Sequence, residues 1–176
     1  MQQYIVFLRA VNVSGKHIIK MQELKAALQA AGFEEVQSYI QSGNLVLQSG
    51  LKSPEVSRQI KELIAAKFQL DIEVFVKSRD VLQQALEHCP YGAECPPNRV
   101  FITLLDRKPD AALLKALQAV DHKEEVFSVW EDVLYFYLPE GMAKAKMGNP
   151  YFEGKLKLKA TGRNVNTVRK MLELAE

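Results

Sequence analysis

Hydrophobic and polar positions in the first half of the chain follow a period of two in some segments and a helical period of about 3.6 in others. The first pattern predicts strands, and the second predicts amphipathic helices that begin near Pro or end at Gly. The expected elements are, in chain order, a strand over residues 3–9, a helix over 21–31, strands over 36–41 and 45–48, a helix over 54–68 and a strand over 72–76. This βαββαβ order is typical of ferredoxin-like folds, in which two helices cover one face of a four-stranded antiparallel sheet.

The second half follows a similar but less complete order. Its expected elements are a helix over 79–88, a strand over 100–105, a helix over 110–120, strands over 126–130 and 133–138, and a last helix over 167–175. Lysine and leucine alternate from Lys155 to Lys159, which predicts a strand with three lysines on one face. The predicted fold class is therefore α+β, with two ferredoxin-like halves built on antiparallel sheets. We expect the first half to span 1–77 and the second, shortened or permuted and ending in a C-terminal helix, to span 78–176, packed as one compact unit.

Composition limits the class of protein without naming it. The chain has 176 residues, of which 48% are hydrophobic and 25% are charged, as in ordinary soluble domains. Its apolar N-terminal run is too short to span a bilayer and lacks the basic start and cleavage site of a secretory signal, so we expect a cytoplasmic protein with no membrane contact. Cys89 and Cys95 have neither redox nor zinc spacing, so we expect free thiols and no metal site.

Charge is segregated along the chain. The first twenty residues carry Arg9, Lys16 and Lys20 with no acid, and residues 142–170 carry eight lysines and arginines against Glu153 alone. The two ends therefore sum to +3 and +7. Cationic side chains and unpaired backbone NH groups at helix starts attract anions, so an anionic partner is the first functional expectation.

Three polar segments supply the candidate ligand-binding residues. These are Arg9, Asn12, Ser14, Gly15 and Lys16 after the first strand, Ser42, Gly43 and Asn44 in the hairpin turn, and Arg163, Asn164 and Thr167 before the last helix. We expect the loop after the first strand and the start of the last helix to hold a phosphate- or carboxylate-bearing small molecule between them. Each segment also has a structural interpretation: turn capping by Asn12 and Ser14, a tight hairpin at 42–44, and helix capping by Asn164 or Asn166.

Recognisable catalytic chemistry is sparse. Ser14-Gly15-Lys16 fails as a P-loop, because that motif needs a glycine where Ala10 stands and a hydroxyl residue where His17 stands. The three histidines are scattered, and no cofactor or reaction follows from their spacing. Two alternatives stay open: an enzyme of phosphate-ester or nucleotide chemistry in the same pocket, and a nucleic-acid-binding module that uses the lysine-rich face at 155–159. The latter would lack the Gly-Phe-rich motif of common RNA-binding sheets.

Three short motifs occur in a fixed order: residues 4–16 followed by Ile19-Lys20-Met21, residues 39–44, and residues 161–168. Together they resemble domain of unknown function family 1697, a widespread bacterial group, over nearly the whole chain. The resemblance leads us to expect glycine where this chain has Ala10 and Ser14, and tryptophan where it has Val165. It implies an α+β fold of two related halves and no established activity.

Overall fold

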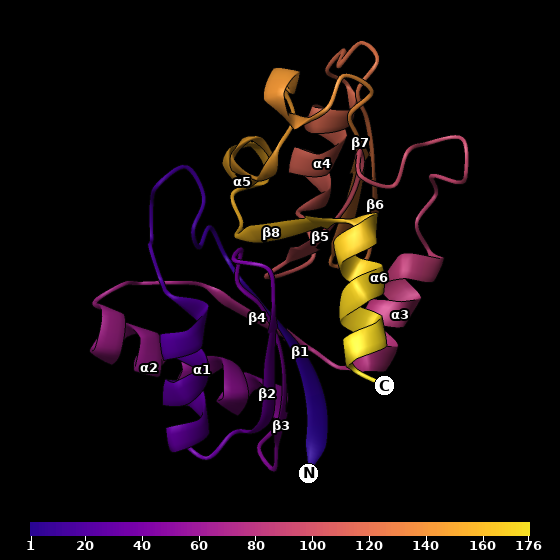
Figure 1. The fold of residues 1–176 in the computed structure, drawn as a ribbon. Helices are drawn as coiled ribbons and strands as arrows, with labels where there is room; N and C mark the ends of the chain where they lie inside the picture. The colour runs from indigo at the N-terminus through magenta and orange to yellow at the C-terminus, as the bar shows by residue number, and fades with distance from the viewer. The chain divides into compact units, whose positions relative to one another are not determined.

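The computed structural model describes residues 1–176 and contains eight strands, six α-helices and one short 3-10 helix (Figure 1). Its internal contacts divide the chain into two compact units. Unit 1 comprises Met1–Gln83 together with Lys170–Glu176, and unit 2 comprises Gln84–Arg169.

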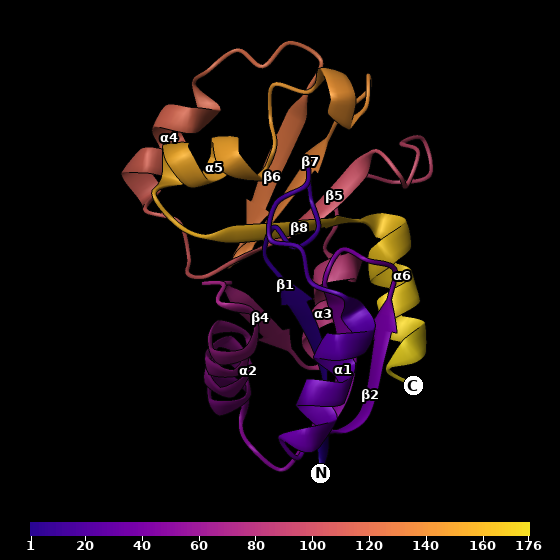
Figure 2. The same ribbon diagram turned by 60° about the vertical axis from the view of Figure 1, so that its left-hand side comes forward.

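Unit 1 is a four-stranded antiparallel sheet with two helices on one face (Figures 1 and 2). Its elements are β1 (Gln2–Leu8), α1 (Met21–Ala30), β2 (Glu34–Tyr39), β3 (Asn44–Ser49), α2 (Ser53–Phe68) and β4 (Val74–Lys77), and α3 (Arg79–Glu87) begins in this unit. The strands lie in the order β2-β3-β1-β4. The expected succession of elements is present, and only the ends of the elements differ by a few residues.

The core of unit 1 follows from the two hydrophobic periods. Alternate residues of β1 point toward the helices and are buried there, among them Tyr4, Val6 and Leu8. Helix α1 contributes residues four apart, such as Leu24 and Leu28, to the same core. Full burial of each aliphatic side chain contributes about 1.5–3 kcal/mol, so the sheet and the helices stabilise each other.

Unit 2 is a second four-stranded antiparallel sheet, with α4 and α5 on one face (Figures 1 and 2). Its elements are β5 (Val100–Leu105), α4 (Ala111–Gln118), β6 (Val126–Trp130), β7 (Val133–Tyr137), the 3-10 helix η1 (Met142–Lys144), α5 (Asn149–Leu156), β8 (Ala160–Asn164) and the start of α6 (Val165–Leu174). The strand order is β6-β7-β5-β8. The α+β class, with two antiparallel sheets and a C-terminal helix, is confirmed; the ferredoxin-like description of each half stays a prediction.

The expectation that the second half is shortened or permuted is wrong, because its elements follow the same order as those of unit 1, namely β5-α4-β6-β7-α5-β8. The segment expected to form a lysine-rich strand forms the end of helix α5 and a turn. Lys155 lies in α5, Lys157 caps that helix in the left-handed region at φ 54°, and Lys159 precedes β8. Leu156 and Leu158 are buried while the three lysines are exposed. The alternation of lysine and leucine therefore predicts correctly which of these residues are buried, although the backbone is not an extended strand.

Aromatic rings fill the core between the unit 2 sheet and its helices. Phe136 lies at the centre, with ring centroids 4.9 Å from Phe101 and 5.2 Å from Phe152 of α5. Around it pack aliphatic residues of α4, β5 and β7, including Leu105, Leu117 and Leu134. The two helices thus cover one face of the sheet through a single apolar cluster.

None of the helices combines the length and the apolar content that crossing a bilayer requires. The His, Cys, Asp and Glu side chains nowhere gather in threes around a position that could hold a metal ion. Cys89 and Cys95 are both free thiols, and each is half-buried.

Candidate functional site

The loop that joins β1 to α1 has an unusual backbone. Ala10 (φ 55°), Asn12 (φ 55°), Ser14 (φ 51°) and His17 (φ 48°) all lie in the left-handed region, although none is glycine. Each such residue costs on the order of 1–2 kcal/mol. Val11 and Val13, which separate Ala10, Asn12 and Ser14, have negative φ, so the sign of φ alternates along this segment. Alternation of this kind turns successive NH groups toward one side and forms anion-binding concavities.

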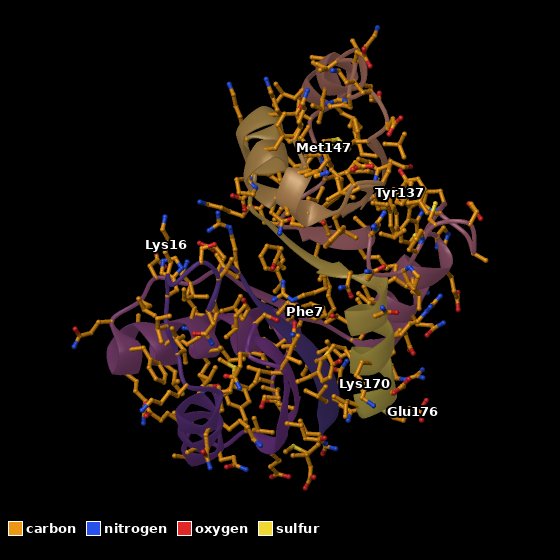
Figure 3. The ribbon with its side chains drawn as sticks, turned by 45° about the horizontal axis from the view of Figure 1, so that its top comes forward. Phe7, Lys16, Tyr137, Met147, Lys170 and Glu176 are labelled. Atoms are coloured by element: carbon orange, nitrogen blue, oxygen red, sulfur yellow. The ribbon has the colours of Figure 1, made fainter.

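The tip of this loop is a two-residue turn. Lys16 N donates to Val13 O at 3.0 Å, and both central residues, Ser14 and Gly15, have positive φ, as in type I′ turns. The NH groups of Ser14 and Gly15 are taken by no backbone acceptor, and both residues are exposed. Lys16 is also exposed and lies at the outer end of the loop (Figure 3). The tip therefore presents one ammonium group beside two free NH donors.

Asn12 holds the loop in place through its side-chain amide. Its Nδ2 donates to Ile19 O at 2.8 Å and to Gln41 O at 2.6 Å, and its Oδ1 accepts from Ile19 N at 2.8 Å. Both Nδ2 protons are thus used within the protein. Asn12, expected from the sequence to orient a ligand, positions the loop instead and ties it to the neighbouring β2–β3 turn.

The β2–β3 turn lies directly against the start of this loop. Leu8 N donates to Gly43 O at 2.8 Å, and Gly43 has φ 75°. A Cβ at position 43 would come within 2.7 Å of Leu8 Cβ and 3.3 Å of Val11 Cβ, so only glycine allows this approach. Asn44 is fully buried and donates to Tyr39 O and to Ser42 Oγ, both at 3.1 Å. The hairpin interpretation of this turn therefore accounts for Gly43 and Asn44.

Eight of the eleven candidate residues gather at one end of the unit 1 sheet. They are Arg9, Asn12, Ser14, Gly15 and Lys16 of the loop, and Ser42, Gly43 and Asn44 of the turn. Arg9 is half-buried where β1 ends, and its backbone NH donates to Glu73 O at 3.0 Å.

The remaining three candidates lie in unit 2, where β8 passes directly into α6. Arg163 donates from Nη1 to Thr161 Oγ1 at 2.9 Å and to Gly162 O at 2.8 Å. Desolvation lowers the pKa of the Arg163 guanidinium to about 10, so the group remains cationic at neutral pH. Asn164 Oδ1 accepts from Thr167 N at 2.9 Å, which makes Asn164, rather than Asn166, the cap of α6.

A basic groove follows α5 in unit 2. It has a volume of about 470 Å³ and is lined by Asp106, Arg107, Pro150, Glu153, Gly154, Lys157, Leu158 and Lys159. Arg107 donates to Asp106 Oδ2 at 2.9 Å and also to the carbonyl of Lys157. Two exposed lysines of the 155–159 segment, Lys157 and Lys159, therefore border a concave surface instead of lying on one face of a strand.

A polar niche next to Arg163 was not expected from the sequence. Gly162 lies beside Thr103 of β5 and Asn149 of α5, and Thr103 Oγ1 and Asn149 Oδ1 are buried without a hydrogen-bond partner. A glycine inside a strand is a signal of close approach by another group, and this signal was available in the sequence. The residues that approach Gly162 could not be predicted from the sequence, because helix α5, which contains Asn149, was not expected.

Comparisons with known proteins identify relatives but no activity. No curated protein sequence matches the chain. Among solved structures, the conserved bacterial protein SP0830 from Streptococcus pneumoniae is similar, with a TM-score of 0.77 and 21% identity over 99% of this chain and 98% of that one. At this identity the likeness shows a shared fold. A family model described as a protein of unknown function, DUF1697, matches residues 1–135, which confirms the resemblance found in the sequence motifs. The chain therefore belongs to the DUF1697 family of proteins of unknown function.

Proposed function

We propose that the protein binds a small phosphate- or carboxylate-bearing ligand at the β1–α1 loop. The observation that carries this proposal is the backbone strain from Ala10 to His17, where four non-glycine residues have positive φ. Strain of this size persists only where the surrounding structure enforces it, and such residues cluster at ligand-binding sites. Here the enforcement comes from Asn12 and from the close approach of Gly43 to Leu8.

The charge of the loop agrees with an anionic ligand. No acidic residue occurs among the first twenty residues. Lys20 pairs with Glu23 at 3.5 Å, whereas the exposed Lys16 stands beside the free NH groups of Ser14 and Gly15. An ammonium group and two NH donors on one turn can all bond to the oxygens of one phosphate or carboxylate, and charge-assisted hydrogen bonds are about twice as strong as neutral ones.

The second group of candidates adds charge in unit 2. Arg163 remains cationic in spite of its desolvation. Asn164 and Thr167 are bonded to each other through the helix cap, so we assign them to positioning and Arg163 to charge.

The test is a thermal-shift screen at low ionic strength with inorganic phosphate, nucleotides, sugar phosphates and organic acids. A ligand bound only by the native state raises Tm in proportion to its affinity and concentration. We expect an anion to raise Tm for the wild type and to do so less for Lys16→Ala and Arg9→Ala. Lys67→Ala, which removes an exposed cation from the last turn of α2, is the matched control and keeps the full shift.

The variant Arg163→Ala is a second control, because Arg163 is a cation of unit 2 and lies outside the loop. We expect the same anion to raise its Tm as much as that of the wild type. A screen in which no anion stabilises the wild type, or in which Lys16→Ala responds like Lys67→Ala, refutes the loop site.

The basic groove supports a second candidate function, nucleic-acid binding. Lys155, Lys157 and Lys159 are exposed, and two of them line the groove together with Arg107. Backbone phosphates bound there would release counterions, so affinity for a single-stranded oligonucleotide would fall steeply with added salt. The variant with all three lysines changed to Ala should bind more weakly and with a shallower salt dependence. An identical salt dependence in this variant would rule the groove out.

A further inference from the structure

A small cavity in unit 2 lies between the turn after α4 and the segment after β7. It has a volume of about 280 Å³, and its lining residues are His122, Lys123, Glu124, Glu125, Pro139, Glu140, Lys144 and Lys146. Glu125 joins the two segments, since its Oε1 accepts from Lys146 N at 2.9 Å and its Oε2 accepts from Met147 N at 2.8 Å. One carboxylate therefore fixes the two walls of the cavity to each other.

His122 is held in a defined orientation in this wall. Its Nε2 lies 2.7 Å from the hydroxyl of Tyr151. The rings of Phe127 and Tyr151 meet the imidazole edge-on, at centroid distances of 5.6 and 5.7 Å. Because Tyr151 takes Nε2, Nδ1 is the ring nitrogen that is left to bond to a ligand. When the tyrosine hydroxyl donates to Nε2, Nδ1 carries the proton and is a hydrogen-bond donor.

Charges of both signs surround the cavity. Glu140 and Lys144 pair with each other at 3.4 Å, and the Glu125 carboxylate is taken by backbone NH groups. Two ammonium groups, of Lys123 and Lys146, and one carboxylate, of Glu124, remain on exposed side chains. A purely anionic guest would meet the uncompensated Glu124, and a purely cationic guest would meet two lysines. A ligand that carries both charges can pair its anionic group with the two lysines and its cationic group with Glu124.

We propose that this cavity binds a small zwitterion of the amino-acid type. Its carboxylate bonds to Nδ1–H of His122 and to the ammonium groups of Lys123 and Lys146, and its ammonium group faces Glu124. The volume of about 280 Å³ lies just below the usual range of ligand pockets, roughly 300–1,000 Å³, which favours a single amino acid over a nucleotide. This site is separate from the β1–α1 loop and does not depend on the function proposed for it.

The test uses the full-length protein and titrates each of the twenty common amino acids by calorimetry up to millimolar concentrations. The tightest binder is then compared with its C-terminal amide, which lacks the carboxylate, and with its N-acetyl derivative, which lacks the ammonium group. We expect each derivative to bind at least about tenfold more weakly, a loss of about 1.4 kcal/mol. An N-acetyl derivative that binds as tightly as its parent would make this an anion site, and the absence of binding by all twenty would overturn the proposal.

Variants assign the two ends of the ligand. Glu124→Gln should weaken binding of the amino acid and leave binding of the N-acetyl derivative unchanged, because only the parent amino acid presents an ammonium group. Tyr151→Phe keeps the ring but frees Nε2, and the loss of one hydrogen bond corresponds to about three- to tenfold weaker binding. Lys115→Ala, which changes an exposed lysine of α4 outside the cavity, should bind the amino acid as tightly as the wild type does.

A nitrogen-15 NMR spectrum of the His122 imidazole provides a readout that a purely structural role would not change. Ligand binding should shift the ring population toward the tautomer with hydrogen on Nδ1. Equal weakening of parent and N-acetyl derivative by Glu124→Gln, or a ring spectrum that does not respond to saturating ligand, would contradict the assignment.

Discussion

Gly162 lies so close to Thr103 that a Cβ at position 162 would stand 2.7 Å from the threonine Oγ1. The same atom would stand 2.8 Å from Asn149 Oδ1. Both oxygens are buried and have no hydrogen-bond partner. Strands β5 and β8 and the start of α5 therefore enclose a polar niche that only glycine leaves open, immediately next to Arg163.

Gly162→Ala should lower the free energy of unfolding by about 1–3 kcal/mol, because the added methyl group overpacks the niche. Gly154→Ala is the matched control: position 154 lies inside α5 with open space around it, and alanine there should raise stability by about 0.5–1 kcal/mol. Urea denaturation measures the free energy of unfolding of both variants. Changes of the same sign would contradict the packing that we describe.

Thr103→Val should raise the free energy of unfolding by about 1 kcal/mol, because it removes a buried hydroxyl that has no partner. The shape of the side chain is nearly kept, so packing against β8 changes little. The measurement is again urea denaturation. A loss of stability would show that the hydroxyl is bonded in solution.

Ala10→Gly should raise stability by about 1 kcal/mol, since Ala10 has φ 55° and glycine removes the steric cost of that conformation. Ala26→Gly, on the exposed face of α1, should instead lower stability by about 1 kcal/mol. If the two variants lose equal stability, the left-handed conformation of Ala10 is not present in solution. Relief of strain at position 10 also predicts weaker anion binding if that strain preorganises the loop.

Gly43→Ala and Gly15→Ala separate conformational strain from close packing. Both glycines have positive φ, but a Cβ at position 15 meets nothing within 4 Å, whereas one at position 43 meets Leu8. We expect a loss of about 1 kcal/mol for Gly15→Ala and a further 1–3 kcal/mol for Gly43→Ala. Similar losses in thermal or urea unfolding would mean that the β2–β3 turn moves away from β1 without cost.

Stability should fall at alkaline pH. Burial raises the pKa of the Tyr135 hydroxyl, which donates to Ala85 O at 2.7 Å, and burial also raises the pKa of the Cys89 thiol. The unfolded chain therefore releases these protons first, so the free energy of unfolding is level below about pH 8 and declines as the pH rises through about 8.5–10. Tyr135→Phe should make the decline shallower. Parallel pH curves for the two proteins would exclude Tyr135 as a source.

Local periodicity was sufficient to predict most of the fold. The bounds of β5 and β6 agree with the expected ranges, because their hydrophobic runs are bounded by turn residues. Helix α5 and strand β8 were missed for a physical reason: Gly154 weakens the helical signal, and Gly162, Arg163 and Asn164 have low strand propensity. Strand β8 exists because it pairs with β5, a contact between residues some sixty positions apart that no local pattern reports.

The ligand-binding role of the candidate residues stays a prediction. The sequence located the β1–α1 loop and the neighbouring turn, because polar residues and glycines interrupt the hydrophobic pattern there. It assigned Asn12 to ligand contact, whereas the amide of Asn12 bonds to Ile19 and Gln41. Hydrogen bonds of this kind depend on where the second segment lies in space, which residue type alone does not determine. His122 likewise seemed isolated, since Tyr151 is distant in sequence.

The division of the chain has a consequence for experiments with fragments. Unit 1 includes Lys170–Glu176, so the last seven residues belong with the first eighty-three. Removal of that short tail would take Met171 and Leu172, both buried, away from the N-terminal unit. No single cut of the polypeptide yields two pieces that each contain one whole unit, and a ribosome cannot finish the first unit until it has synthesised the whole of the second.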